Sequence, residues 1–323
     1  MHNYSDSLKK LISVLTAMLN DILIHKEPTS LYDPVNYLLK KKGKNTRALL
    51  TLLVSNFWSI DVSQIRNLIL AIESLHNFTL IHDDVMDNAL IRRGDPTINS
   101  KWSNNQAILS GDVLMIQSYR HLLKSNFNQE ILNYFTQTAI EICEGQQLDL
   151  DLQKIKTISL DQYYKMIYLK TGVLIKFALT APCFLSKKGA KYLNEMNKLG
   201  DSLGILFQIQ DDYLDLYGQE SQTGKLLGGD VFENKKTFLY ATAFDLSNQK
   251  QKHDLINVYH SKIENKLDEV HSLFQVLGVK HVVELKMEEL RSSILETTQK
   301  LDIKIDKKNL FLEFINTILN RKN

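Results

Sequence analysis

Residues 74–94 read SLHNFTLIHDDVMDNALIRRG and carry three carboxylates at the spacing DDxxD inside an apolar run. An α-helix advances about 100° per residue, so Asp83 and Asp87 lie on one face with Asp84 close beside them. His76 lies two helical turns before Asp83 on the same stripe. Acids on the inner face of an apolar helix repel one another and lose hydration, so a positive partner must meet them. Alone, such a motif would more often mark a solvated helix end.

The same spacing occurs again in FQIQDDYLDL, where Asp211, Asp212 and Asp215 also lie inside an apolar run. Carboxylate oxygens suit Mg²⁺ and Mn²⁺, and the chain has no Cys or His cluster with zinc-ligand spacing. At about 4 Å and an effective dielectric constant of about 20, each like-charge pair costs roughly 4 kcal/mol. A diphosphate could approach these acids only with divalent ions in between. The two motifs together therefore predict a site for a hard metal and a diphosphate.

Composition favours one soluble, globular domain over residues 1–323, because 44% of the residues are hydrophobic and 24% are charged. Only 4 prolines and 13 glycines interrupt the chain, and no linker-like stretch divides it. A net charge of +2 from scattered residues argues against nucleic-acid binding. Cys143 and Cys183 are most simply free thiols in a reducing cytosol, so we expect a cytoplasmic protein. Without 18 consecutive apolar residues, we expect no membrane-spanning helix.

Apolar periodicity predicts helices along most of the chain, and no strand-like alternation of useful length occurs, so the fold class is all-α. Ser5 is a candidate cap for the first helix, Pro34 is expected to open a short second helix, and Ser159 with Gln162 matches a capping box. The other predicted helices span residues 46–58, 62–88, 104–124, 128–149, 159–180, 187–216, 251–275, 279–300 and 307–320, the first spans 5–25, and one more begins at 235–237.

Several enzyme classes are excluded by missing motifs. The chain contains no phosphate-binding loop of the GxxxxGK[ST] kind, which argues against a nucleotide triphosphatase. It also lacks a G-x-S-x-G nucleophile elbow. The chemistry that remains is departure of a diphosphate, assisted by metal ions and cationic side chains.

In these motifs the chain resembles the trans-isoprenyl diphosphate synthases, the polyprenyl synthetase family that includes farnesyl and geranylgeranyl diphosphate synthases. HDDVMDNALIRRG resembles the family's first aspartate-rich motif with its trailing arginines. GQQLD, the pair Lys170-Thr171, FQIQDDYLD and GK…GGDVFENKKT match later motifs in the expected order, over roughly residues 34–237. One DDxxD is weak support, whereas this ordered set is highly specific.

The resemblance implies a bundle of about a dozen helices around a deep central cavity, in a homodimer. The two aspartate motifs would face each other and hold Mg²⁺ on an allylic diphosphate. Asp83, Asp87 and Asp211 match the most direct ligands, while Asp84, Asp215 and especially Asp212 would act through water or through contacts to the ligands. The positions that hold the allylic substrate are matched by Arg92, Lys170, Thr171, Gln208, Lys225 and Lys235. Those that bind the diphosphate of isopentenyl diphosphate are matched by Lys44, Arg47, His76 and Arg93.

The implied reaction begins with ionisation of the allylic diphosphate, which metals and cations assist where charge develops on the leaving group. The isopentenyl double bond then attacks the carbocation, and a proton is lost, with the released diphosphate as the base. The chain departs from the family in one place. Where the family reads GGKRxRP, residues 42–48 read KGKNTRA, which leaves the affinity for isopentenyl diphosphate open.

Product length is expected to depend on the helix of the first motif. Phe78 lies five residues before Asp83, roughly 7.5 Å along the helix, where a growing chain would meet it. A core aromatic is the alternative reading of Phe78. By resemblance, a bulky residue here is typical of short-chain enzymes, and the smaller Thr79 favours a twenty-carbon product over a fifteen-carbon one.

Two other functions stay open at this stage. A catalytically weak partner subunit of a heteromeric synthase is favoured by the altered 42–48 stretch, although the intact DDxxD motifs oppose it. A terpene cyclase also ionises diphosphates through DDxxD, but a second DDxxD with basic residues for a second diphosphate argues against it.

Overall fold

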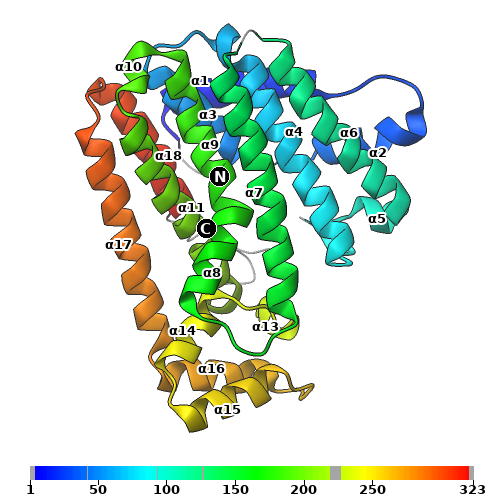
Figure 1. The fold of residues 1–323 in the computed structure, drawn as a ribbon, viewed down its shortest axis with the longest axis vertical. Coiled ribbons are helices and arrows are strands. Elements are labelled where there is room, and N and C mark those ends of the chain that lie inside the picture. The colour runs from blue at the N-terminus through cyan, green and yellow to red at the C-terminus, as the bar shows by residue number, and fades with distance from the viewer. Residues whose placement is uncertain (1–3, 42, 93, 126, 219–226, 320–323) are drawn as a thin grey trace. The chain divides into compact units, whose positions relative to one another are not determined.

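The structure, a computed structural model, describes residues 4–41, 43–92, 94–125, 127–218 and 227–319 (Figure 1). Their regular structure is almost entirely helical, which confirms the all-α prediction. In the described residues the strands are β1 (Ile91–Arg92) and β2 (Asp95–Pro96), which pair antiparallel around Gly94 at φ 81°. The first helices are α1 (Asp6–Leu19), the 3₁₀ turn η1 (Asn20–Ile22), α2 (Thr29–Leu39), α3 (Thr46–Phe57), α4 (Val62–Met86), α5 (Ile98–Lys101) and α6 (Asn104–Leu123).

The chain continues through a second series of helices. These are α7 (Gln129–Gln153), α8 (Leu160–Ile167), the π-helical turn η2 (Tyr168–Gly172), α9 (Val173–Thr180), the 3₁₀ turn η3 (Ala181–Leu185), α10 (Lys187–Ala190), α11 (Leu193–Tyr217), α13 (Gly229–Phe232), α14 (Phe238–Leu246), α15 (Gln249–Tyr259), α16 (Lys266–Val276), α17 (Val279–Lys300) and α18 (Ile305–Leu319).

The chain divides into two compact units. Unit 1 comprises residues 1–136, 177–194 and 302–314, and unit 2 comprises residues 137–176, 195–301 and 315–323. Helices α7, α9, α11 and α18 each contribute residues to both units. A single domain over residues 1–323 stays a prediction.

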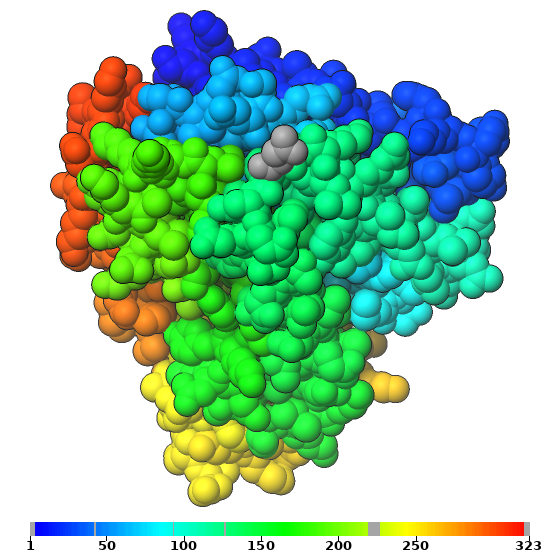
Figure 2. Space-filling view, turned by 45° about the horizontal axis from the view of Figure 1, so that its top comes forward, coloured from blue at the N-terminus to red at the C-terminus, as the bar shows by residue number. Residues whose placement is uncertain are grey.

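Unit 1 is built around α4, which packs against α3 and α6. Five consecutive α4 residues, 68–72, are at most 1% exposed, so the middle of this helix is buried on every side. Gly111 of α6 allows the close approach, because a Cβ there would lie 2.2 Å from Nε2 of His82. Part of α6 lies on the molecular surface in the teal region of Figure 2.

Unit 2 brings η2 close to α7 and α11 through glycines. A Cβ at Gly145 would lie 2.2 Å from the backbone nitrogen of Lys170, and one at Gly204 would lie 2.6 Å from Cα of Gly172. The turn that carries Lys170 and Thr171 is therefore fixed between two helices at backbone contact distance. π-Helical turns of this kind are frequent at functional sites.

The predicted helix positions were mostly right, and three boundaries were wrong. The first helix ends at Leu19 rather than residue 25. Pro34 lies inside α2 instead of opening it. It is tolerated because the Ser30 carbonyl, which an N–H at residue 34 would normally reach, accepts instead from Nε2 of Gln106 at 3.2 Å. The run 251–275 is divided into α15 and α16 by the polar connection 260–265.

Both predicted helix caps are present. The Ser5 hydroxyl accepts from the backbone N–H of Leu8 at 3.3 Å. Ser159 and Gln162 form the predicted capping box, with each side chain accepting from the other residue's backbone N–H.

One stretch in the described residues, Leu160–Leu185, is long and apolar enough to cross a membrane by length and composition alone. Two thirds of its most apolar window is buried inside the structure, and core helices of soluble proteins pass the same test. It is therefore only a weak indication of a membrane span.

Candidate active site

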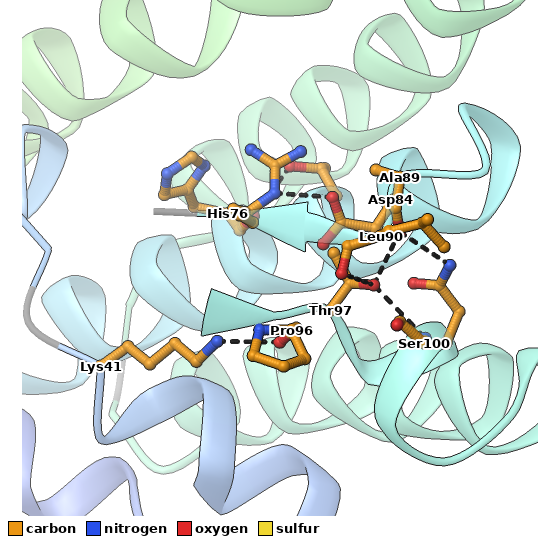
Figure 3. Close-up of polar contacts among 11 residues, drawn as sticks. Lys41, His76, Asp84, Ala89, Leu90, Pro96, Thr97 and Ser100 are labelled. Atoms are coloured by element: carbon orange, nitrogen blue, oxygen red, sulfur yellow. Dashed lines mark hydrogen bonds and ion pairs between the residues drawn. The ribbon is translucent and has the colours of Figure 1, made fainter. Parts of the chain in front are cut away.

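The first aspartate motif ends helix α4, and its three carboxylates differ in exposure. Figure 3 shows Asp84, the buried one. Asp84 is 4% exposed, and its Oδ1 accepts from Nε of Arg92 at 2.7 Å. Burial raises the pKa of Asp84, and the Arg92 guanidinium opposes that rise. Asp83 is half-buried and Asp87 is exposed at the C-terminal end of the helix. Asp84 thus stabilises the segment that follows, beside the two predicted direct ligands.

The loop carrying Arg92 is fixed by the Thr97 side chain, as Figure 3 shows. Its hydroxyl donates to the Ala89 carbonyl at 2.7 Å and accepts from the Ser100 N–H at 3.3 Å. Lys41 donates to the Pro96 carbonyl at 3.0 Å. These bonds hold the β1–β2 turn against α5 and the end of α2, and so define where Arg92 lies. Arg93 lies outside the described residues.

Two residues predicted to bind isopentenyl diphosphate are in contact at the start of α3. The Nη1 of Arg47 lies 3.2 Å from Nε2 of His76 on α4. Because a guanidinium can only donate, Nε2 of His76 is the acceptor in this contact. Lys44 is exposed just before α3. The structure therefore brings Arg47 and His76 together, and their binding of isopentenyl diphosphate stays a prediction.

A buried carboxylate completes the start of α3. Asn45 precedes the helix at φ 44° and makes no side-chain cap, while Oε1 of Glu73 accepts from the Ala48 N–H at 3.2 Å. Glu73 is 4% exposed and comes from α4, so the cap is supplied by the neighbouring helix. Ala48 stands where the family pattern has proline, which has no N–H to donate. The altered stretch therefore gains a hydrogen bond that the family pattern lacks.

The second aspartate motif lies in α11, and Asp212 is its buried member, only 5% exposed. Its Oδ2 accepts from the hydroxyl of Tyr163 at 2.5 Å and from the Phe238 N–H at 2.7 Å. Its Oδ1 accepts from the Gln208 amide at 2.9 Å. Burial, reinforced by nearby Asp230, raises the pKa of Asp212 to about 7 despite these donors. Asp212 therefore joins α8, α11 and α14 rather than facing a ligand.

Two of the other predicted residues are linked to Asp212, and the rest form separate contacts. Oγ1 of Thr171 donates to Oε1 of Gln208 at 3.1 Å, and Gln208 donates on to Asp212. Lys170 pairs with Asp149 at 2.5 Å. Asp215, two residues from the end of α11, accepts at Oδ2 from the Asp230 N–H at 3.0 Å. Asp211 is half-buried beside Asp212.

Lys235 lies after α13, where its Nζ is 2.7 Å from Glu233 and 3.4 Å from Asp230. Its side chain is one-third exposed, and its binding of the allylic diphosphate stays a prediction. Lys225 lies outside the described residues. Sequence reasoning did not assign a role to Asp149, Tyr163 or Asp230. Asp149, in GQQLD, was noted only for its helical spacing, and no sequence signal linked Tyr163 to Asp212.

The donor set fits a hard divalent cation. Among the described residues no three His, Cys, Asp or Glu side chains converge within one arrangement that could hold a metal. Asp83 and Asp87 in unit 1 and Asp211 in unit 2 present carboxylate oxygens, the ligand type that Mg²⁺ prefers. Asp84 and Asp212 accept hydrogen bonds from protein donors, and their indirect roles at a metal stay a prediction.

Phe78 is half-buried against a core cluster on one side of α4. The cluster consists of Val35, Leu38, Ile81, Ile98, Ala107 and Leu114. The Phe78 ring packs edge to face against the His82 ring, with the two ring centroids 4.7 Å apart. The hydroxyl of Thr79 donates back to the His76 carbonyl at 2.8 Å, so Thr79 presents its small side chain without extending it. Whether these two residues limit product length stays a prediction.

Comparison with solved structures places this fold among the isoprenyl diphosphate synthases, all-α transferases. A crystal structure of a geranylgeranyl pyrophosphate synthase matches with a TM-score of 0.89 and 33% identity, covering 99% of this chain and 100% of that one. The geranylgeranyl pyrophosphate synthetase from Pyrococcus horikoshii matches with a TM-score of 0.90 and 27% identity, covering 97% of both chains.

Sequence comparison agrees over nearly the whole length. The polyprenyl synthetase family model matches residues 28–277. A short chain isoprenyl diphosphate synthase from Methanothermobacter thermautotrophicus is 30% identical over 94% of this chain and 95% of the relative. A geranylgeranyl diphosphate synthase from Methanosarcina mazei is 31% identical over 98% of both. The chain belongs to the polyprenyl synthetase family, and the predicted family and enzyme class are confirmed.

Proposed function

We propose that this protein is a Mg²⁺-dependent trans-prenyltransferase that condenses isopentenyl diphosphate with an allylic diphosphate and releases a twenty-carbon product. One observation carries the proposal. In both aspartate motifs the middle carboxylate, Asp84 or Asp212, is buried and bonded to protein, while the carboxylate before it, Asp83 or Asp211, is more accessible. This division gives each motif a rigid anchor next to a ligand, which is what a precisely oriented metal site requires.

Asp83, Asp87 and Asp211 would hold Mg²⁺, with Mn²⁺ as a substitute, and the ion supplies charge neutralisation for the leaving diphosphate. Lys170, Thr171, Gln208, Lys235 and Arg92 orient the allylic diphosphate. The cationic side chains among them face negative charge as the C–O bond breaks. Lys44, Arg47 and His76 orient isopentenyl diphosphate, whose double bond attacks the resulting carbocation. The proton lost in forming the new double bond passes to the released diphosphate, so no side-chain nucleophile is needed.

The product length rests on Phe78 and on the relatives. Several relatives are named geranylgeranyl diphosphate synthases, and two are named geranylfarnesyl diphosphate synthases. Phe78 is bulky and backed by the core cluster, so it is suited to stop chain growth. A twenty-carbon product is therefore favoured over a fifteen-carbon one.

A homodimer in the cytoplasm completes the proposal. Leu109, Ile116 and Leu123 repeat every seven residues along α6 and are 57%, 66% and 73% exposed. Such a stripe on one helix face suits burial against a second copy of the chain. The two cysteines are free thiols, as a reducing compartment maintains. Light scattering on wild type and Ile116→Lys tests the dimer: a monomeric wild type would overturn it.

A metal-dependence assay tests the catalytic proposal. Incorporation of labelled isopentenyl diphosphate should require Mg²⁺, stop with EDTA and return with Mg²⁺ or Mn²⁺. Asp83→Asn should lower the rate at least about a hundredfold. Undiminished incorporation in EDTA, or full activity of Asp83→Asn, would refute the metal role.

A further inference from the structure

The 231–235 turn connects α13 to Thr237 and carries Lys235, the cation assigned above to the allylic diphosphate. Asn234 adopts φ 58°, a left-handed conformation that asparagine tolerates better than most residues. The Lys235 N–H donates to the Asp230 carbonyl at 2.9 Å, and its own carbonyl accepts from the Thr237 N–H at 3.1 Å. The Asn234 N–H also donates to the Val231 carbonyl at 3.1 Å, so the position of the Lys235 backbone is set by the conformation of this short turn.

A buried lysine from α16 fixes this turn. Nζ of Lys266 donates to the Val231 carbonyl at 2.7 Å and to Oδ1 of Asn234 at 2.7 Å. Lys266 is only 3% exposed. A lysine ammonium is rarely buried this deeply, and doing so costs free energy unless its donors are satisfied. The two bonds join the end of α13 to the left-handed residue of the turn, one on each side of the bend.

A tyrosine from α15 bonds the same turn at its next residue. The hydroxyl of Tyr259 donates to the Lys235 carbonyl at 2.6 Å, and the side chain is fully buried. The Lys266 ammonium also lies 5.4 Å from the Tyr259 ring centroid, within the range of a cation–π interaction. The two anchoring side chains therefore support each other as well as the turn.

Packing at the start of α16 leaves little freedom for this anchor. A Cβ at Gly228, which has φ 74°, would lie 2.3 Å from Cδ1 of Leu267. Leu267 therefore presses on the backbone just before α13, next to the residue that bonds the turn. Figure 1 shows α13, α15 and α16 together at one end of unit 2.

We propose that Lys266 and Tyr259 are positioning residues that set the location of Lys235 for binding the allylic diphosphate. Neither side chain needs to touch the substrate, because both act on the backbone and on Asn234. The proposal rests on the proposed function, since it assigns Lys235 to that diphosphate. It adds a part of the site that lies beneath the turn, on helices where no chemical motif was found in the sequence.

The test is a double-mutant cycle between Lys266 and Lys235, read as KM for an allylic diphosphate at saturating isopentenyl diphosphate. Lys266→Met keeps the length of the side chain and removes its donors. It should raise this KM about tenfold, the loss of one well-placed interaction, with KM for isopentenyl diphosphate unchanged. In the Lys235→Ala background the same substitution should have no further effect, because its effect passes through Lys235.

Matched variants separate positioning from loss of structure. Lys262→Met removes an equal charge from an exposed lysine nearby and should leave KM unchanged. Tyr259→Phe deletes only the hydroxyl, and Asn234→Gly keeps the left-handed turn while deleting the acceptor for Lys266. Both should raise KM for the allylic diphosphate, and they carry the test if Lys266→Met does not fold.

The outcomes are distinguishable. If Lys235→Ala alone leaves KM for the allylic diphosphate unchanged, the proposed role of Lys235 is wrong. If Lys235→Ala raises KM but Lys266→Met, Tyr259→Phe and Asn234→Gly do not, the positioning proposal is overturned while the function stands. Equal effects of Lys266→Met in both backgrounds would also overturn it, because Lys266 would then act independently of Lys235.

Discussion

The hydroxyl of Tyr163 donates to Oδ2 of Asp212 at 2.5 Å, and the backbone N–H of Phe238 reaches the same oxygen at 2.7 Å. Burial raises the pKa of Tyr163 well above its usual range, so the phenol stays protonated and remains a donor. Asp212, the middle aspartate of the second motif, therefore bonds α11 to both α8 and α14. Its neighbour Asp211 is half-buried and is the predicted metal ligand.

Substitutions at Asp211 and Asp212 should separate activity from stability. Asp212→Ala leaves the buried Tyr163 hydroxyl and Phe238 N–H without their acceptor, and should cost about 2–4 kcal/mol of unfolding free energy. Asp211→Asn should change stability by less than about 0.5 kcal/mol yet lower kcat at least about a hundredfold. Denaturant melts and initial rates on both variants measure this. Equal losses of stability in the two would contradict the division of roles.

The pH dependence of stability tests the burial of Lys236, whose Nζ lies 5.5 Å from the Tyr259 ring centroid. Burial, reinforced by Lys266, lowers the pKa of Lys236 to about 8 from the usual 10.5. Below pH 8 the buried charge costs stability, and between pH 8 and 10.5 the unfolded chain binds more protons, so stability rises with pH. Lys236→Met removes this cost. The free energy of unfolding that Lys236→Met gains over wild type should be about 2 kcal/mol larger at pH 7 than at pH 10. If the stability difference between Lys236→Met and wild type did not change with pH, burial of the Lys236 charge would not be its cause.

The sequence predicted which helices carry the site residues better than it predicted the burial and hydrogen bonds of each residue. The DDxxD spacing placed both motifs on helices, and α4 and α11 confirm this. The indirect role expected for Asp212 came from family resemblance, and its physical cause, the bonds from Tyr163 and Phe238, joins residues far apart in the chain. Spacing describes one helix, whereas these bonds depend on how three helices pack.

The same limit explains the boundaries that were wrong. Pro34 was predicted to start a helix because a proline inside a helix has no N–H to donate to the carbonyl four residues earlier. Here that carbonyl, of Ser30, accepts from the Gln106 side chain, which comes from another helix. The run 251–275 has continuous helical periodicity, yet α15 ends at Tyr259 and α16 begins at Lys266, and both of these residues bond the 231–235 turn. Tertiary contacts overrode local preference in each case.

Glu73 should matter for isopentenyl diphosphate because it caps the helix that carries Arg47. Glu73→Leu removes the acceptor for the Ala48 N–H and should cost about 1–3 kcal/mol of stability. It should also raise KM for isopentenyl diphosphate with little change in KM for the allylic substrate, since the start of α3 would shift. Steady-state kinetics with each substrate varied in turn will show this. An equal rise in both KM values would point to general loss of structure instead.

Phe78→Ala should lengthen the product beyond twenty carbons. The substitution removes a ring that packs on the core cluster and on His82, so a growing chain could extend past this point. The distribution of product lengths, resolved by chromatography, is independent of how much enzyme remains folded. Thr79→Ser, which keeps the hydroxyl that bonds the His76 carbonyl, is the matched control and should not shift the distribution. An unchanged distribution in Phe78→Ala would show that Phe78 does not limit product length.

The central claim is that this chain alone elongates an allylic diphosphate. The most direct measurement is product analysis after the purified protein is incubated with Mg²⁺, labelled isopentenyl diphosphate and allylic primers of increasing length. We expect incorporation without any added protein, with an all-trans twenty-carbon diphosphate as the main product. No incorporation unless a second synthase is supplied would establish a partner subunit, and a cyclised hydrocarbon would establish a terpene cyclase. Either result would contradict the account.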